Sequence, residues 1–356
     1  MDANHYVPIL LTKRGERYAL RDLPDSVHQA MTPMFVVAPI DWDFEEERPA
    51  KSATEHLSRL PTELHESRGS LPGFVDLPFL EDDDDLDSGF HPLVWLTAEC
   101  PTPLIPTTSP GRTDAYKSAA ALVVARDGLG ACFRLAIPEW PSNTGAAPID
   151  GLLAEPGLAP TDVDLVLDLG DETGDLARTA VRQELVNLPY RDDWRSVIVA
   201  GTGMPKTLPL GRGVHEIERG EWAIYQSILS HGTARVPTFG DYAIANPDPT
   251  FEIDPRWISM SANVRYTADP IWIAPKGELF KGKGGTGLGS AAVPPVLETL
   301  RAQPGYGPAN HCELEQWVDA VLSGSGSTGN AETWRRYGTL HHLQRVTEQL
   351  ATVHGA

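Results

Sequence analysis

Eight short strand-like runs recur along the first 244 residues, and this repetition restricts the fold more than any other feature of the chain. Each run is rich in apolar residues and is bounded by turn residues or by a helical pattern. The runs are Tyr6–Leu11, Phe35–Pro39, Gly73–Pro78, Thr102–Thr107, Ala131–Ile137, Val163–Leu169, Ser196–Thr202 and Thr238–Ile244. Their starts lie 29 to 42 residues apart, and a strand–helix unit needs about thirty residues. The spacing predicts an α/β fold, a (β/α)8 TIM-like barrel, and the alternative is a doubly wound open α/β sheet.

The sixth run indicates which side of each strand faces the barrel interior. In D-V-D-L-V-L-D-L-G, the residues Leu165, Leu167 and Leu169 alternate with Asp164 and Asp168. Side chains alternate across a strand, and helical patterns flank this run on both sides, so the leucines should face the helices. The aspartates then point inward, and Asp168 lies at the carboxyl end of its strand, where barrels of this type carry function.

The pattern changes after the eighth run, and we expect one domain over residues 1–356, with the strand units in 1–250 and an appendage in 251–356. Trp257–Pro275 alternates around a turn, which predicts a β-hairpin excursion. Gly277–Ser290 is predicted to be a glycine-rich loop. Three helices are expected after it, at about Ala291–Ala302, Cys312–Leu322 and Ala331–Val353. One of these extra C-terminal helices should close the helical ring of the barrel.

Composition restricts the classes of partner. The formal net charge of −20 argues against broad nucleic-acid binding, which needs a local excess of Lys and Arg. No apolar run approaches membrane-spanning length, and the N-terminus lacks the positive region of a signal peptide. The three cysteines are far apart and lack metal-ligand spacing, which predicts reduced thiols in a cytoplasmic protein. The acidic run Glu81–Asp87 lacks the pattern of a calcium loop and is expected to be solvated.

The same alternation assigns several charged residues to the barrel mouth. We expect Lys13, Asp76, Arg134, Asp168 and Asp241 to gather there. Buried charges must be paired, so one hypothesis is an ion network that only fills the barrel. The functional hypothesis is a polar pocket in which Arg134 and Lys13 hold an anionic group. The carboxylates Asp76, Asp168 and Asp241 are then the candidate catalytic residues, as general base or metal ligand.

Two glycine-containing loops support an anion site. Barrel enzymes often bind phosphate through the loops after strands seven and eight. Here the candidates are 201–206, which contains Thr202, and the glycine-rich Gly282–Ser290 with Lys281 and Lys283 beside it. Glycine lets backbone N–H groups approach a phosphate closely, although glycine-rich loops more often act as flexible connectors.

The sequence does not identify a cofactor. Asp168, Asp171, Glu172 and Asp175 offer oxygen ligands for a divalent metal, but an acidic loop after a strand is more often simply solvated. His341 and His342 are adjacent, so on a helix they diverge by about 100° and do not share a metal. We expect one of them to be packed and the other exposed.

Several of these pieces together resemble the bacteriophage beta protein family, which also occurs in bacterial genomes. The matching stretches are Tyr6–Leu10 with Lys13, Gly15 and Glu16; Asp164–Gly170; Phe239–Tyr242; Asn263 with Arg265–Thr267; and Gly329-Asn330, Trp334-Arg335 and His341-His342. The resemblance implies one long domain and a phage-defence context. It names no settled reaction.

The resemblance also bears on individual residues. Asp76, Arg134 and Asp168 match the family pattern, and Glu16, Tyr242 and Arg265 are expected to bind ligand with Lys13. The pattern has a second lysine two residues before Lys13 and an acid in the second strand, where this chain has Leu11 and Val36. If those positions carry chemistry, this member is altered or inactive.

Two functions follow as hypotheses. The first is a barrel that binds a phosphorylated or otherwise anionic small molecule, such as a nucleotide, at its carboxyl end. If it is an enzyme, the residues suit acid–base hydrolysis or phosphoryl transfer. The alternative is a non-catalytic interaction subunit of a defence system, working with a partner nuclease encoded nearby.

Overall fold

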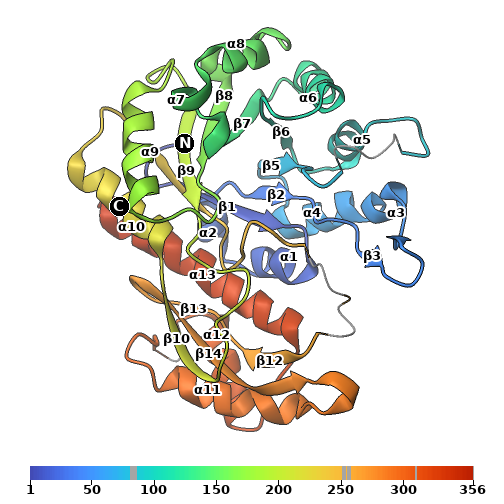
Figure 1. Cartoon of the computed structure of the whole chain (residues 1–356), viewed down its shortest axis with the longest axis vertical. Coiled ribbons are helices and arrows are strands. Elements are labelled where there is room, and N and C mark those ends of the chain that lie inside the picture. Colours follow the sequence, from blue (N-terminus) through green and yellow to red (C-terminus); the bar gives the residue numbers. More distant parts are fainter. Residues whose placement is uncertain (81–85, 251–253, 255–257, 309–310, 356) are drawn as a thin grey trace.

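Eight parallel strands close into a barrel in the computed structural model, which describes residues 1–80, 86–250, 254, 258–308 and 311–355 (Figure 1). The strands are β1 (Tyr6–Leu11), β2 (Met34–Val36), β5 (Gly73–Asp76), β6 (Leu104–Thr108), β7 (Ala131–Ala136), β8 (Val163–Asp168), β9 (Ser196–Gly201) and β11 (Thr238–Asp241). Strand β1 pairs in parallel with both β2 and β11, which closes the sheet. The predicted barrel is therefore confirmed, and the open-sheet alternative is wrong.

Helices surround the barrel and follow its strands. They are α1 (Arg14–Arg21), α2 (Asp25–Gln29), α3 (Ala53–Leu57), α4 (Leu60–Arg68), α5 (Pro92–Glu99), α6 (Asp114–Asp127), α7 (Pro141–Thr144), α8 (Ala147–Ala154), α9 (Asp175–Asn187) and α10 (Gly220–His231). Local signals fix their ends. The Thr113 side chain, for example, accepts a hydrogen bond from Tyr116 N at the start of α6, and Gly128 ends that helix with a φ of 66°.

Helix α13 (Ala331–His354) closes the ring, as the sequence predicts for one of the C-terminal helices. It packs against α1 and β1, and Figure 1 shows it crossing the molecule between the barrel and a smaller sheet. Its first turn is capped by Asn330, whose side chain accepts hydrogen bonds from Glu332 N and Thr333 N.

The core has two layers that follow the alternation predicted for β8. Leu165 and Leu167 lie outside the barrel and pack with Val181 of α9, whereas Val166 lies among the interior residues. Asp164 and Asp168 are 1% and 7% exposed. Neither is on a solvated outer face, so the orientation on which the candidate site depends is present.

The appendage is a small antiparallel sheet in the order β10 (Gly213–Glu218), β14 (Ile271–Lys281) and β12 (Met260–Asn263), with β13 (Tyr266–Thr267) also paired to β14. Helices α11 (Val293–Arg301) and α12 (Glu313–Leu322) accompany it. The predicted hairpin corresponds to β13 and β14, and Trp257 lies outside the described residues. Strand β10 comes from the segment between β9 and β11 and was not predicted.

The predicted glycine-rich loop is shorter than expected, and most of the predicted acidic run lies outside the described residues. Gly277–Lys281 belongs to β14, so the predicted glycine-rich loop begins five residues later, where the chain forms the 3₁₀ turns Lys283–Gly285 and Gly289–Ala292. Residues 81–85 of the acidic run lie outside the described part. Shorter elements complete the chain: a hairpin of β3 (Trp42–Asp43) and β4 (Arg48–Pro49), and 3₁₀ turns at Ile137–Glu139 and Pro160–Asp162. Within the described ranges, no helix has the length and apolar character needed to cross a membrane.

Candidate functional site at the carboxyl end of the barrel

Three charged residues meet where the barrel strands end. Asp76 ends β5, Asp168 ends β8, and Arg134 lies two residues before the end of β7. Their strands are near neighbours in the barrel, so their inward side chains converge at one end. Arg134 Nη1 donates to Asp76 Oδ2 at 2.8 Å, and Arg134 Nε donates to Asp168 Oδ2 at 2.8 Å. One guanidinium thus bridges two carboxylates.

Tyr242 and Arg112 extend this network. Arg134 Nη2 donates to Tyr242 Oη at 2.7 Å, and the Tyr242 hydroxyl donates to Asp168 Oδ2 at 2.5 Å. Arg112, which precedes α6, donates from Nη2 to Asp76 Oδ1 at 2.6 Å. Asp76 is fully buried, so this carboxylate needs the two guanidiniums that contact it.

The network fixes the protonation of its members. Burial raises the pKa of Tyr242 well above its usual value, and the nearby Asp168 carboxylate adds to this rise against the opposing charge of Arg134. Burial opposes the charge of Arg134, but Tyr242, Asp168 and Asp76 outweigh it and hold the pKa of the guanidinium well above its usual range. At neutral pH, Tyr242 is therefore a neutral phenol and Arg134 a cation.

A cavity of about 360 Å³ lies over this network. Its polar wall includes Arg112, Arg134, Asp168 and Tyr242, and its apolar wall is formed by Ile9, Leu11, Val36 and Phe79. A concave apolar pocket with a few convergent polar groups is the usual form of a small-molecule site. Asp168 is the bridged carboxylate that lines this cavity, whereas Asp76 is fully buried and is not among the lining residues.

A second group of charges lies beside the mouth, at the start of α1 and α13. Glu16 is 2% exposed, and Arg335 Nη1 donates to its Oε1 at 2.8 Å. Arg265, in the turn between β12 and β13, donates to the Ile244 carbonyl oxygen. Arg265 and Arg335 line a cavity of about 200 Å³, and Lys13 lines a neighbouring one of about 730 Å³.

The pKa directions in this second group show crowded positive charge. Burial and the charge of Arg335 together lower the pKa of Arg265 to about 10, against the opposing charge of Glu16. Burial and Arg335 also lower the pKa of Lys13. Burial raises the pKa of Glu16 against the attraction of Arg335 and Lys13. The charge of Arg335 thus acts on both Arg265 and Lys13, and Glu16 offsets part of this repulsion.

The family comparison agrees with the resemblance seen in the sequence. The model of the Beta protein family matches residues 6–348, which is nearly the whole chain. The chain belongs to the Beta protein family. A search of the curated proteins found no match.

The two departures from the family pattern are neighbours in this Beta protein. Leu11 of β1 is in register with Val36 of β2, and both line the barrel-mouth cavity. A lysine and an acid at these positions would face each other across two strands as an ion pair. Here the pair is apolar, so this part of the cavity wall carries no charge.

The structure corrects the place of Asp241 in this family member. Its neighbours Gly240 and Tyr242 face the barrel interior, so Asp241 faces outward with Phe239. Asp241 is fully buried, where it accepts a hydrogen bond from the Tyr6 hydroxyl and lies 2.8 Å from His342 Nε2 of α13. The prediction that Asp241 lies at the mouth is wrong, because it joins β11 to α13 on the other side of the sheet.

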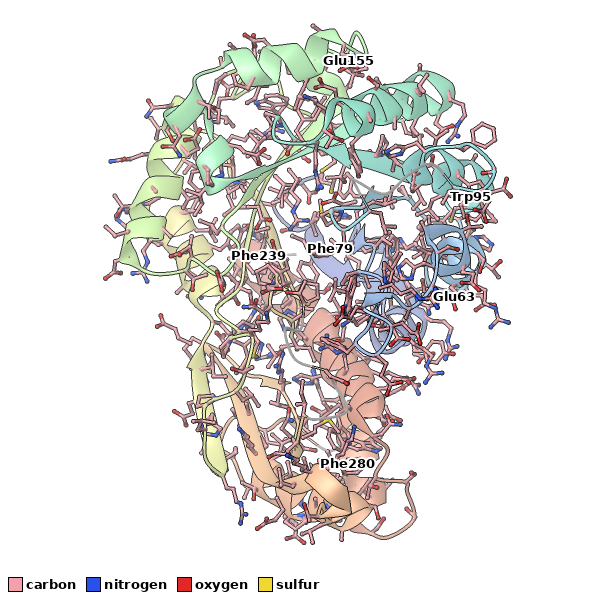
Figure 2. The ribbon with its side chains drawn as sticks, turned by 45° about the vertical axis from the view of Figure 1, so that its right-hand side comes forward. Glu63, Phe79, Trp95, Glu155, Phe239 and Phe280 are labelled. Carbon is pink, nitrogen blue, oxygen red and sulfur yellow. The ribbon has the colours of Figure 1, made fainter. Side chains whose placement is uncertain are left out.

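Three predicted ligand-binding residues also lie away from the barrel-mouth cavity. Thr202 is fully buried, and its hydroxyl donates to Ala245 O at 3.3 Å and accepts from Met204 N at 3.0 Å. Lys281 ends β14 opposite Met260, and Lys283 follows it. Figure 2 shows Phe280, the neighbour of Lys281, in a different part of the molecule from Phe79 of the cavity wall. The structure therefore does not bring these two lysines to the mouth.

The acidic loop after β8 does not gather around Asp168. Asp171, Glu172 and Asp175 are exposed, whereas Asp168 is held by Arg134 and Tyr242.

The structure also shows residues that the sequence interpretation missed. Arg112 lies in a loop after a barrel strand, which is a usable signal, but Arg335 lies on a helix some 320 residues from its partner Glu16.

Proposed function

We propose that this Beta protein binds a small molecule with an anionic group, such as a phosphate ester or nucleotide, at the carboxyl end of the barrel. The observation that carries the proposal is the convergence of Lys13, Arg265 and Arg335 near Glu16, with both arginines lining one cavity. Positive charges that repel one another are thus gathered in a chain with a net charge of −20. An anion between the arginines would relieve their mutual repulsion.

The barrel-mouth cavity suits the remainder of such a ligand. Ile244 lines the smaller arginine cavity, while Ala245 and Asn246, the next residues along the chain, line the larger one. The apolar wall with Phe79 offers contact to a base or another flat group. We therefore place the anionic end at Arg265 and the body of the ligand over Arg134 and Tyr242.

Any acid–base chemistry would fall to Asp168 rather than Asp76. Asp168 lines the cavity and accepts a hydrogen bond from Tyr242, which lines the same cavity. Asp76 is fully buried and contacts both Arg112 and Arg134. Both oxygens of Asp76 already accept hydrogen bonds from guanidiniums, so we propose binding as the function and assign Asp76 a supporting role.

Thermal unfolding with a panel of anions tests the proposal. The panel is ATP, ADP, AMP, adenosine, pyrophosphate, inorganic phosphate and sulfate. At a hundred times its dissociation constant, a bound ligand should raise the free energy of unfolding by about 2.7 kcal/mol. We expect at least one phosphorylated compound to stabilise the chain, and adenosine to do so less than AMP.

A pair of matched variants locates the site. Arg265→Gln and Lys283→Gln each remove one positive charge, but only Arg265 lines the arginine cavity. We expect R265Q to weaken binding at least tenfold and K283Q to leave it unchanged. Absence of stabilisation by every anion, or equal affinity in R265Q and the wild type, would contradict the proposal.

The contrary result would favour the interaction-subunit alternative. Strand β10 is an edge strand of the small sheet, with β14 as its sheet neighbour, and Leu210 beside it is 97% exposed. An exposed edge can add a strand from another protein. We propose, on the family resemblance, that such a partner would belong to a phage-defence system, and co-purification with products of adjacent genes would test this.

A further inference from the structure

Three side chains with different donor atoms converge beside the small sheet, and none of them lines the barrel-mouth cavity. Cys312 precedes α12, Glu315 lies in its first turn, and His341 lies on α13. Cys312 Sγ is 2.9 Å from Glu315 Oε2 and 3.5 Å from His341 Nδ1, and Nδ1 is 3.1 Å from Glu315 Oε1. All three residues are buried. In the described part of the chain, they are the group of this kind whose ligand atoms lie within 4.8 Å of one another.

The orientation of His341 is set from its other side. His341 Nε2 lies 2.9 Å from the carbonyl oxygen of Thr267, and a carbonyl can only accept, so Nε2 carries the hydrogen. In a neutral imidazole, the lone pair is then on Nδ1, which faces Cys312 and Glu315. A ring nitrogen that donates to a backbone carbonyl while the other faces a ligand set is typical of metal-binding histidines.

We propose that Cys312, Glu315 and His341 bind a zinc ion. Thiolate sulfur, imidazole nitrogen and carboxylate oxygen are the three donor types that Zn²⁺ takes in proteins, and the sulfur disfavours Mg²⁺ and Ca²⁺. The thiolate and the carboxylate together carry two negative charges, which a dication balances. A neutral assembly of this kind is what a buried site requires.

The distances fit a tetrahedral ion with one adjustment. With Zn–S of about 2.3 Å and Zn–N of about 2.05 Å, a tetrahedral angle separates sulfur and nitrogen by about 3.5 Å. The Cys312 Sγ to His341 Nδ1 distance is 3.5 Å. Glu315 Oε2 is 2.9 Å from Sγ, closer than this edge, so the carboxylate must withdraw by roughly half an ångström to admit the ion.

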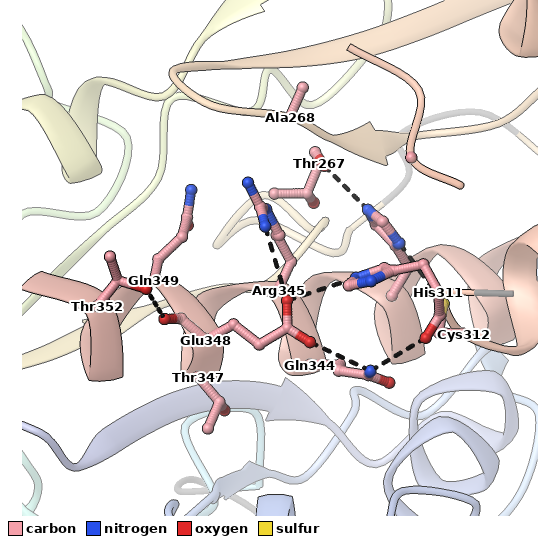
Figure 3. Close-up of polar contacts among 12 residues, drawn as sticks. Thr267, Ala268, His311, Cys312, Gln344, Arg345, Thr347, Glu348, Gln349 and Thr352 are labelled. Atoms are coloured by element: carbon pink, nitrogen blue, oxygen red, sulfur yellow. Dashed lines mark hydrogen bonds and ion pairs between the residues drawn. The ribbon is translucent and has the colours of Figure 1, made fainter. Parts of the chain in front are cut away.

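A cavity and His311 beside the three side chains offer a fourth ligand for the ion, and the elements that meet there indicate a structural role. His341 borders a cavity of about 270 Å³ that is also lined by His311. Figure 3 shows His311 beside Cys312, the next residue in the chain. The ring centres of His311 and His341 are 5.6 Å apart. Water from this cavity, or His311 after a small movement, can complete the tetrahedron. The ion then ties α12 to α13 and, through Thr267, to β13.

A simpler explanation accounts for part of the same geometry. Glu315 Oε2 accepts from Cys312 N at 3.1 Å, which is a capping box at the start of α12. An ion pair between Glu315 and His341 would then need no metal. The two explanations differ in whether the sulfur of Cys312 binds a cation, and that difference can be measured directly.

The experiment uses the full chain with a matched pair of cysteine variants. Cys312→Ser removes the thiolate but keeps a preferred helix-capping residue, so the helix should still form. Cys100→Ser is the control, because Cys100 is also buried but contacts Pro61 O outside the cluster. Each protein is loaded with Zn²⁺ or Co²⁺, freed of excess metal by gel filtration, and assayed for metal content and for thiolate-to-Co²⁺ charge-transfer absorption. Circular dichroism checks the fold.

We expect wild type and C100S to retain about one metal ion per chain and to show the thiolate–cobalt band, as a three-ligand site predicts. C312S should lose the band and bind zinc at least tenfold more weakly, and His341→Gln should weaken binding similarly without removing Cys312. Two outcomes would overturn the proposal. One is a wild-type protein without the charge-transfer band, and the other is a C312S variant that holds zinc as tightly as C100S.

Discussion

Glu221, in the first turn of α10, is a fully enclosed carboxylate outside the proposed ligand site. Its Oε2 accepts from Gly203 N at 2.9 Å, and its Oε1 lies 3.5 Å from Arg219 Nε. Burial, helped by the charge of Asp241 and opposed by Arg219, raises the pKa of Glu221 to about 7. The folded protein therefore holds a proton on Glu221 in a pH range where the unfolded chain has released it.

This shift predicts that the contribution of Glu221 to the free energy of unfolding falls as the pH rises from about 4.5 to about 7. In that window Glu221 holds more protons in the folded state than in the unfolded state, so its contribution to the slope is negative, at most about 1.4 kcal/mol per pH unit. Glu221→Gln should remove this contribution, as measured by urea unfolding at several pH values. Glu298→Gln, at an exposed position, is the control and should keep the wild-type slope. Parallel curves for wild type and E221Q would contradict the prediction.

The sequence could place some residues of the candidate site but not others, depending on whether the neighbouring residues of the same strand show which face is apolar. Asp76, Arg134 and Asp168 could be placed at the mouth because alternation with apolar neighbours fixes the side of each strand. Asp241 could not, because Gly240 beside it has no side chain to indicate which face is apolar. The prediction of one packed and one exposed histidine at 341 and 342 was also wrong, because both are buried. α13 lies between the barrel and the small sheet, so opposite faces of that helix are covered.

At the scale of elements, the approach of α13 to the rest of the chain depends on Gly338. A Cβ at this position would lie 2.9 Å from the Arg265 carbonyl oxygen and 3.0 Å from Ile244 Cδ1. Alanine is more favourable than glycine inside a helix by about 1 kcal/mol. We nevertheless expect Gly338→Ala to lower the free energy of unfolding by about 1–3 kcal/mol, because the Arg265 carbonyl oxygen is a backbone atom and cannot move aside as easily as the end of a flexible side chain.

Gly151 in α8 supplies the matched helical control. It is exposed, and a Cβ there would meet nothing within 4 Å. Gly151→Ala should therefore stabilise the protein by up to about 1 kcal/mol, and the two substitutions should differ in sign. Denaturant unfolding of both variants measures this. If G338A stabilises the chain as G151A does, α13 does not depend on this close contact.

The sequence predicted the strands whose pairing partners recur at a regular interval along the chain. Each barrel strand pairs with neighbours one βα unit away in the sequence or, at the closure, with the first strand, so the apolar runs and their regular spacing predicted all eight. Strand β10 pairs instead with β14, whose register partners begin 53 residues after Glu218. A pairing across that separation is set by the tertiary fold and leaves no periodic signal in the sequence. Gly277 was misread for a related reason, because its missing Cβ serves close packing against Val296 and Ala292 rather than flexibility.

At the scale of the whole molecule, the appendage is joined to the barrel by several separate connections. Strand β10 leaves the barrel after β9 and the chain returns as α10 and β11, while α13 crosses back to pack on β1. Buried polar contacts follow these crossings. Arg219 Nη1, just after β10, donates to Gln349 Oε1 of α13 at 2.8 Å, and Asp241 of β11 pairs with His342 of the same helix. Loss of α13 together with the small sheet would leave Arg219 without Gln349 and Asp241 without His342, and removing a polar partner from a buried charge costs several kcal/mol.

This coupling predicts that residues 1–356 unfold as one cooperative unit. If one part opened first, the remainder would retain unpaired buried charge, so the half-folded state should be poorly populated. Hydrogen exchange read by mass spectrometry at increasing denaturant can follow peptides from β8 and from β14 separately. We expect both to lose protection at the same denaturant concentration, and the circular dichroism transition to coincide with them. Loss of protection in β14 well before β8 would show that the appendage is an independent domain, and the single-domain prediction would then be wrong.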